Sequence, residues 1–248
     1  MQALLYSFLA GTSTVLGAFL LFFLGQPRER SMALLLGFAG GIMLGVSAFE
    51  LLPGATELGS MSAAVVGFIL GCAMMLLLDR LLPHAHLSSD DDLVVENPEN
   101  LPVGGSPMLR TGYLILFGIA LHNLPEGLAI GAGLEASPQM GLFIALAIGL
   151  HNIPEGLAMA GPLKSGGLPM KKVLLFTLLA GLMTPLGTAI GLVVFRVSPA
   201  MVGGSLAFAA GAMVYIVNDE LIPQANAMHS HLANLGLVTG LLLAFALL

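Results

Sequence analysis

Long apolar stretches alternate with short polar or turn-forming segments along the whole chain. Eight of these stretches hold roughly 20 residues, enough for an α-helix to cross about 30 Å of hydrocarbon. Because helices satisfy their own backbone hydrogen bonds in lipid, the pattern predicts an all-α integral membrane protein with a single transmembrane domain over 1–248. The predicted spans are about 4–24, 31–53, 61–82, 111–134, 139–161, 172–195, 200–223 and 231–248, with a polar loop at about 83–110.

The composition agrees with a membrane protein. Hydrophobic residues make up 57% of the 248 residues and charged residues only 9%, whereas about a quarter of a soluble domain is charged. The net charge of −6 arises largely from the 83–110 loop and indicates no nucleic-acid partner. The first apolar stretch lacks a basic leading region and an evident cleavage site, so we expect it to remain as a span. The single Cys72 provides no disulfide framework.

The Lys and Arg residues predict the orientation of the spans, because short cytoplasmic loops carry an excess of them. If the N-terminus is extracytoplasmic, every basic residue except Arg196 falls on the cytoplasmic side. These residues are Arg28, Arg30, Arg80, Arg110, Lys164, Lys171 and Lys172. The even number of spans then places the C-terminus outside as well, and the 83–110 loop inside.

An internal repeat relates the two ends of the chain. A shift of 170 positions lays GFAGGIMLGVSAFELLPGA (37–55) over AFAAGAMVYIVNDELIPQA (207–225), with a Glu and a Pro in register. Spans 1–3 therefore look like a copy of spans 6–8, and the odd number of spans between their starts inverts the second copy. Such a 3+2+3 arrangement with inverted repeats is typical of secondary transporters. A shared small-residue composition is the alternative explanation.

A second repeat is a ten-residue motif, LHNLPEGLAI in span 4 and LHNIPEGLAM in span 5, which recurs after 29 positions. Helix positions four apart lie about 40° apart on one face, so the His and the Glu of each motif point the same way. Spans 4 and 5 are consecutive and therefore antiparallel, and the motif is central in both. We thus expect His122 to lie level with Glu155, and Glu126 level with His151.

Four ionisable groups in the middle of the membrane need neutralisation, since one unpaired acid at a helix centre costs about 2.5–3.5 kcal/mol. The motif prolines Pro125 and Pro154 additionally free backbone carbonyls. A divalent cation would balance the two glutamates, and neutral imidazoles would add ligands without charge. Such ligands suit Zn²⁺ and Fe²⁺, and also Mn²⁺, Co²⁺ or Cd²⁺. Protonated acids that hydrogen-bond within the bundle are the alternative.

The HNxPEG signature on both spans resembles that of the ZIP (Zrt/Irt-like) zinc and iron transporters, especially the short bacterial-type members. The resemblance covers nearly the whole chain. It implies a homodimer in the lipid bilayer of the bacterial inner membrane, which moves Zn²⁺ or a similar divalent metal from outside to the cytoplasm by elevator-like alternating access. The metal would be the substrate, so we expect no catalytic cofactor.

The resemblance also implies a binuclear metal site between spans 4 and 5. Carried over by position, its first half corresponds to His122, Glu126, His151, Glu155 and Met43. Its second half corresponds to Asn123 and Asn152, the two bridging glutamates and a carboxylate of span 6, at which this chain has Thr184 in the sequence GLMTPLG. Two ions that share two carboxylates would leave about +2 uncompensated, so we expect one tight site.

Other polar residues are candidates for the path of the metal. Glu50 lies near the outer end of span 2, and Asp219 and Glu220 lie near the inner end of span 7. They are candidates for an entrance and an exit, and interfacial charges at helix ends explain them equally well. His84 and His86 of the cytoplasmic loop are candidates to receive released metal, for which a solvated loop is the alternative.

Two other functions are open at this point. An intramembrane zinc-dependent enzyme would use the metal to activate water, but the chain has no H-E-x-x-H motif and no spare acid in the twin motif. A structural membrane protein would use the motif only to hold helices together. The sequence does not select the metal, and it does not decide between a carrier and channel-like conduction or reveal proton coupling.

Overall fold

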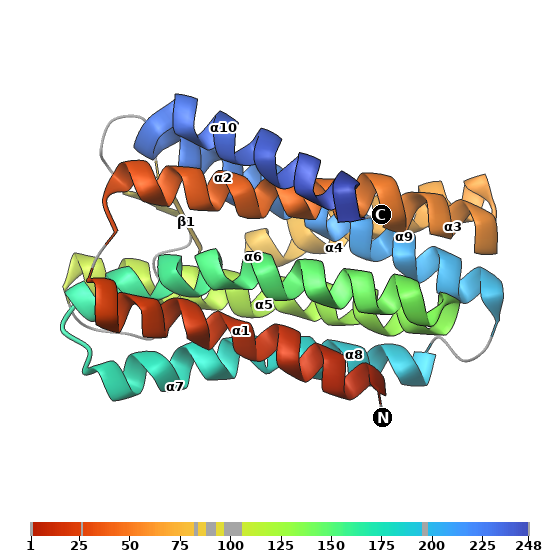
Figure 1. Cartoon of the computed structure of the whole chain (residues 1–248), viewed down its shortest axis with the longest axis horizontal. Coiled ribbons are helices and arrows are strands. Elements are labelled where there is room, and N and C mark those ends of the chain that lie inside the picture. The colour runs from red at the N-terminus through yellow and green to blue at the C-terminus, as the bar shows by residue number, and fades with distance from the viewer. Residues whose placement is uncertain are drawn as a thin grey trace.

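The computed structural model describes residues 2–25, 27–81, 84–87, 93–96, 106–194 and 198–247. Nearly all of them lie in helices that run along the long axis of the molecule (Figure 1). Seven stretches are long and apolar enough to cross a membrane, and this confirms the predicted all-α membrane protein. They are Gln2–Phe23, Glu29–Leu58, Met61–Leu78, Met108–Ala136, Pro138–Ser165, Met170–Val193 and Pro199–Leu247.

The helices follow the predicted spans closely. The first part of the chain forms α1 (Gln2–Leu24), α2 (Glu29–Val46), the π-helical turn η1 (Ser47–Leu51), α3 (Leu52–Leu58) and α4 (Met61–Leu81). The motif-bearing helices are α5 (Pro107–Ala136) and α6 (Pro138–Ser165). The last part forms α7 (Met170–Gly181), α8 (Met183–Val194), α9 (Pro199–Ile216), the π-helical turn η4 (Val217–Leu221) and α10 (Ile222–Leu247).

Three of these helices begin with the same local signal, a serine followed by a proline. Ser106, Ser137 and Ser198 each have extended backbone and accept a hydrogen bond from the N–H three residues on. The proline that follows has no N–H to satisfy and has the φ angle of a helix. The sequence thus sets the first residues of α5, α6 and α9.

The structure differs from the predicted spans in three places. The single span expected at 172–195 consists of α7 and α8, which meet at Leu182. The helical stretch expected to end at 223 continues as far as His229, where the backbone is non-helical (φ −169°, ψ 98°). Beyond this break the final part of α10 runs in the direction opposite to α9 (Figure 1). The predicted 83–110 loop contains a two-stranded antiparallel sheet, β1 (His84–Leu87) and β2 (Leu93–Glu96), with His84 paired to Glu96.

The helices form two layers (Figure 1). One layer contains α2, α3, α4, α9 and α10, in which α2 packs on α10 and α4 packs on α9. The other contains α1, α5, α6, α7 and α8. The layers meet where α5 contacts α9 and α6 contacts α2. This arrangement encloses α5 and α6, which carry the twin motif.

Close helix packing in the first layer depends on glycine. A Cβ atom at Gly240 of α10 would overlap with the carbonyl of Phe38 in α2, and a Cβ atom at Gly71 of α4 would overlap with the carbonyl of Phe208 in α9. Small residues allow membrane helices to approach in this way, because lipid provides no hydrophobic force between them.

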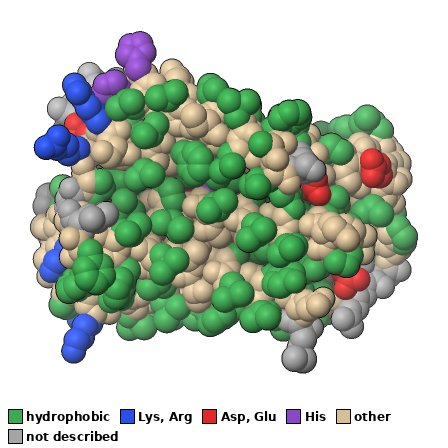
Figure 2. Space-filling model, viewed as in Figure 1, with side chains coloured by type: hydrophobic (Ala, Val, Ile, Leu, Met, Phe, Trp, Pro, Cys, Tyr) green, Lys and Arg blue, Asp and Glu red, His purple; other side chains and the backbone are tan. Residues whose placement is uncertain are grey.

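The surface separates apolar and charged side chains. Large hydrophobic side chains are exposed over the length of the helices, among them Phe23, Leu70 and Val193. Lys and Arg side chains gather at the end of the molecule where α2 and α7 begin, and most visible acids lie toward the other end (Figure 2). An apolar belt with a basic end is the surface expected of a helical bundle in a bilayer.

Candidate metal site

The two copies of the motif lie on α5 and α6 in the interior of the molecule. Both helices continue through their motif prolines, Pro125 and Pro154. The histidines are 1% exposed and the glutamates 0%. Four groups that strongly prefer water are therefore fully enclosed, which requires compensation within the site.

The side chains pair across the two helices as predicted. His122 Nε2 lies 3.2 Å from Glu155 Oε2, and His151 Nε2 lies 2.7 Å from Glu126 Oε1. His151 Nε2 is also 4.0 Å from Glu155 Oε1. Each imidazole thus meets the carboxylate of the other motif, and this confirms the expected antiparallel match of the motif centres.

Several ligand atoms of this cluster are unsatisfied. His122 Nδ1, Glu126 Oε2 and Glu155 Oε1 are buried and have no hydrogen-bond partner within the described part of the chain. His122, Glu126 and Glu155 each offer one ligand atom, and these three atoms lie within 4.8 Å of one another. A buried polar atom without a partner costs about 1–3 kcal/mol. A cation bound to the unsatisfied carboxylate oxygens, Glu126 Oε2 and Glu155 Oε1, would remove that cost for both of them, and imidazole with carboxylate is a zinc-type ligand set.

His151 is held in one orientation by its own helix. Its Nδ1 lies 3.0 Å from the carbonyl oxygen of Ala147 and donates a proton to it. This bond leaves Nε2 as the atom that faces the two carboxylates. Metal-binding histidines are commonly fixed by such a bond from the other ring nitrogen.

Asn123 and Asn152 connect the site to the neighbouring helices. Asn123 Nδ2 donates to the carbonyl of Ala180 in α7 (2.9 Å), and Asn152 Nδ2 donates to the carbonyl of Ala10 in α1 (3.1 Å). Both side chains are fully buried, and neither Oδ1 has a hydrogen-bond partner in the described residues. The amides therefore link α5 to α7 and α6 to α1, and each keeps one acceptor oxygen.

Thr184 of α8 lies beside the α5 motif. A Cβ atom at Gly127, the residue after Glu126, would overlap with the Thr184 carbonyl. The Thr184 side chain is 0% exposed, and its hydroxyl has no hydrogen-bond partner among the described residues. The position expected to hold a carboxylate thus holds a neutral group in a tightly packed place.

The acids proposed as entrance and exit occupy the two π-helical turns. Glu50 lies in η1, and Asp219 and Glu220 lie in η4; all three are half-buried. A Cβ atom at Gly118 would lie 3.1 Å from Glu220 Oε1, and Gly118 precedes His122 by one turn of α5. Glu220 therefore lies near the buried cluster, and sequence spacing alone did not indicate this contact.

The remaining predicted residues differ in what the structure says of them. Met43 is fully buried in α2 and belongs to the main hydrophobic core. The backbones of His84 and His86 lie in β1, and their side chains lie outside the described residues. Their roles as ligands stay predictions.

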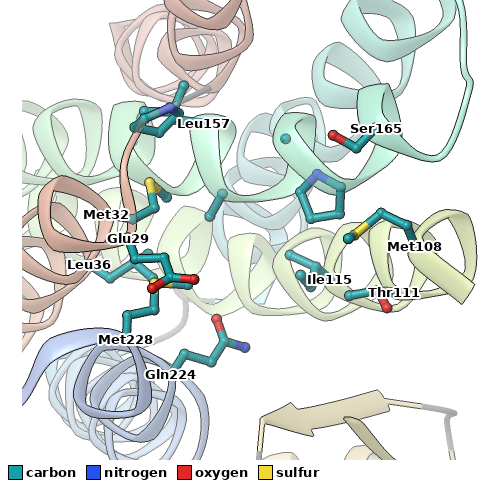
Figure 3. Close-up of a pocket in the computed structure, with 14 residues that line it drawn as sticks. Glu29, Met32, Leu36, Met108, Thr111, Ile115, Leu157, Ser165, Gln224 and Met228 are labelled. Carbon is teal, nitrogen blue, oxygen red and sulfur yellow. The ribbon is translucent and has the colours of Figure 1, made fainter. Parts of the chain in front are cut away.

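A cavity of about 300 Å³ opens at the basic end of the molecule. Its walls come from both layers, and Figure 3 shows side chains of α2, α5, α6 and α10 around it. Thr111, Ile115, Gln224 and Met228 are among the residues that line it. Sequence reasoning did not find this cavity, because none of these residues carries a recognisable metal-binding signal.

An integral membrane protein that encloses a transition-metal ligand cluster between two antiparallel helices belongs to the class of metal-handling membrane proteins. The family model described as ZIP zinc transporter matches residues 81–248, more than half of the chain. Proteins named zinc transporter ZupT from Salmonella paratyphi A (strain ATCC 9150 / SARB42) and Salmonella newport (strain SL254) are each 41% identical over 227 residues, which cover 90% of this chain and 86% of the relative.

The chain therefore belongs to the ZIP zinc transporter family. This confirms the resemblance inferred from the twin motif. It also places the chain with transporters and not with enzymes, so the alternative of an intramembrane metalloenzyme is not supported.

Proposed function

We propose that this protein is a carrier that takes up divalent transition metal, zinc above all, and releases it to the cytoplasm by alternating access. The metal would bind His122, Glu126, His151 and Glu155 on α5 and α6. The observation that carries the proposal is their full burial and cross-pairing, with ligand atoms left unsatisfied. The zinc-transporter names of the ZupT relatives support zinc as the substrate.

Charge balance explains how such a site tolerates the membrane interior. Two glutamates and one divalent ion sum to zero when both imidazoles are neutral. Two protons shared between the histidines and the glutamates give the same sum when the metal is absent. The cluster therefore exposes no net charge to the apolar interior in either condition, and this avoids the penalty for a buried unbalanced ion.

The proposed topology has eight spans, and the 3+2+3 inverted repeat is supported by paired contacts. The break at His229 would divide the 199–247 stretch into spans 7 and 8. Asn152 donates a hydrogen bond to the carbonyl of Ala10, and Asn123 donates one to the carbonyl of Ala180. The asparagines are 29 positions apart and the alanines 170, which are the offsets of the two sequence repeats. Equal contacts at equal offsets favour a pseudo-two-fold axis in the membrane plane.

The proposed orientation places the basic end of the molecule in the cytoplasm, with both chain termini outside. The cavity then faces the cytoplasm, and Glu220 is the candidate exit residue, because it approaches Gly118, which lies along α5 between Ile115 of the cavity and His122 of the cluster. Glu50, its repeat equivalent, is the candidate entrance residue. Localisation in the inner membrane agrees with the bacterial relatives, and the homodimer stays a prediction from the family resemblance.

Zinc uptake by proteoliposomes tests the proposal. Glu126→Gln keeps the size of the side chain but removes one of the two charges that balance the ion, so uptake should fall by at least about 100-fold, the effect of roughly 3 kcal/mol of lost charge pairing. Glu135→Gln is the matched control, since Glu135 lies on the same helix and is exposed. Equal uptake by Glu126→Gln and the control would exclude the cluster from the path.

A further inference from the structure

The two ends of the interface between the layers are closed to different degrees. At the end away from the cavity, Met140 of α6 reaches across to α3. A Cβ atom at Gly54 would lie 2.7 Å from Met140 Cε and 3.4 Å from Leu206 Cδ1. Leu206 of α9 is fully buried. The flexible thioether of Met140 therefore fills the space beside Gly54, and together with Leu206 it forms an apolar contact that closes this end of the interface between the layers.

The internal repeats assign each of these three residues an equivalent at the opposite end. The 29-residue offset relates Met140 to Thr111, and the 170-residue offset relates Gly54 to Gln224 and Leu206 to Leu36. Two identities support the 29-residue offset around Thr111. Gly112 and Ile115 of the α5 segment TGYLI correspond to Gly141 and Ile144 of the α6 segment MGLFI.

All three equivalents line the 300 Å³ cavity, namely Thr111, Gln224 and Leu36 (Figure 3). The same positions are thus in contact at one end and line a cavity at the other. A neighbouring pair follows the same rule, since Ile144 is 0% exposed while its equivalent Ile115 is half-buried and lines the cavity.

We propose that Thr111, Gln224 and Leu36 form the inner gate of the carrier, which is open in this structure. The proposal rests on the proposed function, alternating access. In a pair of inverted repeats, the second state has the contacts of the first state with the two repeats exchanged. When Met140, Gly54 and Leu206 separate, Thr111 and Gln224 therefore come together over Leu36 and close the cytoplasmic side.

The two gates differ in chemistry. The outer contact consists of a thioether, a leucine and a glycine, so it gains from removing apolar surface from water. The inner contact would bring the Gln224 amide to the Thr111 hydroxyl. A hydrogen bond that only replaces earlier hydrogen bonds of the two groups has a small net value. The inner gate should therefore close less firmly than the outer gate, which agrees with the inward-open arrangement found here.

Cysteine cross-linking tests the inner gate, and Cys72→Ala provides a cysteine-free background. In this background, Thr111→Cys/Gln224→Cys reports the inner gate and Gly54→Cys/Met140→Cys reports the outer contact. Met108→Cys/Gln224→Cys is the matched control, because Met108 lines the same cavity one turn nearer the start of α5. Each pair is treated in proteoliposomes with a short bifunctional thiosulfonate during zinc uptake, and then with a reductant.

Both gate pairs should cross-link, the inner pair severalfold more than the control, and each cross-link should stop uptake until it is reduced. Failure of the inner pair to exceed the control, while the outer pair cross-links and untreated proteins take up zinc, would overturn the gate and leave the proposed function intact. Absence of zinc uptake in the cysteine-free and wild-type proteins alike would instead refute the proposed function.

A non-covalent variant provides a second test. Thr111→Met/Gln224→Gly gives the inner end the side chains of the outer contact and should hold it closed more often. A reporter cysteine at Ile115 in the Cys72→Ala background should then react several times more slowly with a charged maleimide added to the cytoplasmic side. An unchanged reaction rate would contradict the gate, provided that the variant protein is folded and still takes up zinc.

Discussion

Replacement of Thr184 by Glu should convert a one-metal site into a two-metal site. Thr184 is fully buried, its hydroxyl has no hydrogen-bond partner in the described residues, and its backbone lies against Gly127 beside Glu126. Asn123 and Asn152, the other residues that the family resemblance assigns to the second site, also have buried side-chain oxygens without a hydrogen-bond partner in the described residues. The variant thus adds a third carboxylate beside the two bridging glutamates.

The size of the effect follows from the charges. Glu126 and Glu155 carry −2, so a second divalent ion in the wild-type site would leave +2 in a fully buried place. The effective penalty for an uncompensated buried ion is several kcal/mol, so the second ion should bind at least about 1000-fold more weakly than the first. A third carboxylate removes one of the two excess charges and should recover roughly half of this penalty.

The measurement is the metal content of purified protein after saturation with zinc and removal of free metal. We expect about one ion per chain in the wild type and in Thr184→Gln, which has the length of Glu but no charge, and two in Thr184→Glu, because only the carboxylate lowers the charge penalty. Two equally tight ions in the wild type would show that neutral oxygens suffice, and one ion in all three proteins would refute the charge argument.

Two further predictions concern protons and packing. Zinc uptake at subsaturating metal should fall as the external pH is lowered, because a proton on His122 or Glu155 removes a metal ligand. Uptake kinetics across a pH series should show an apparent KM for zinc that rises as the pH falls. A constant KM would contradict competition between protons and zinc. Gly211→Leu should destabilise the protein by roughly 1–3 kcal/mol, because the new side chain would overlap with the Phe68 carbonyl. Gly204→Leu is the control, since there is open space around the Cβ position of Gly204. Equal melting temperatures for the two variants would refute this prediction.

The sequence predicted most of the fold because lipid leaves few solutions for a chain with this pattern. Apolar length alone placed the helices, whereas three of their exact starts depend on the serine–proline pairs at Ser106, Ser137 and Ser198, which apolar length does not include. The cross-pairing of the motifs was predictable as well, since consecutive spans are antiparallel and both motifs are central. The break at His229 falls within the predicted gap between spans 200–223 and 231–248. What periodicity could not provide was the division between α7 and α8, because no residue in GLMTPLG is a unique signal for a break.

The candidate site was predictable in its acids and histidines and not in its surroundings. Ionisable residues are costly in lipid, so they indicate function by their presence alone. Gly118 carries no such signal, although its missing side chain leaves the space in which Glu220 approaches the turn before His122. Contacts of this kind depend on which helix faces are opposed, and that information arises only from the packed bundle.

The inverted repeat makes the limits of sequence reasoning clear. A sequence repeat describes both halves equally, so it predicts a symmetric molecule with equal outer and inner gates. The folded chain is asymmetric, with Met140 packed over Gly54 and with Thr111 and Gln224 both lining a cavity. Since one sequence encodes two equivalent contacts that cannot form together, the asymmetry belongs to a state and not to the repeat. Under the proposed function, the metal site between the repeats would then be reached from one side at a time, and exchange of the two contacts would provide transport.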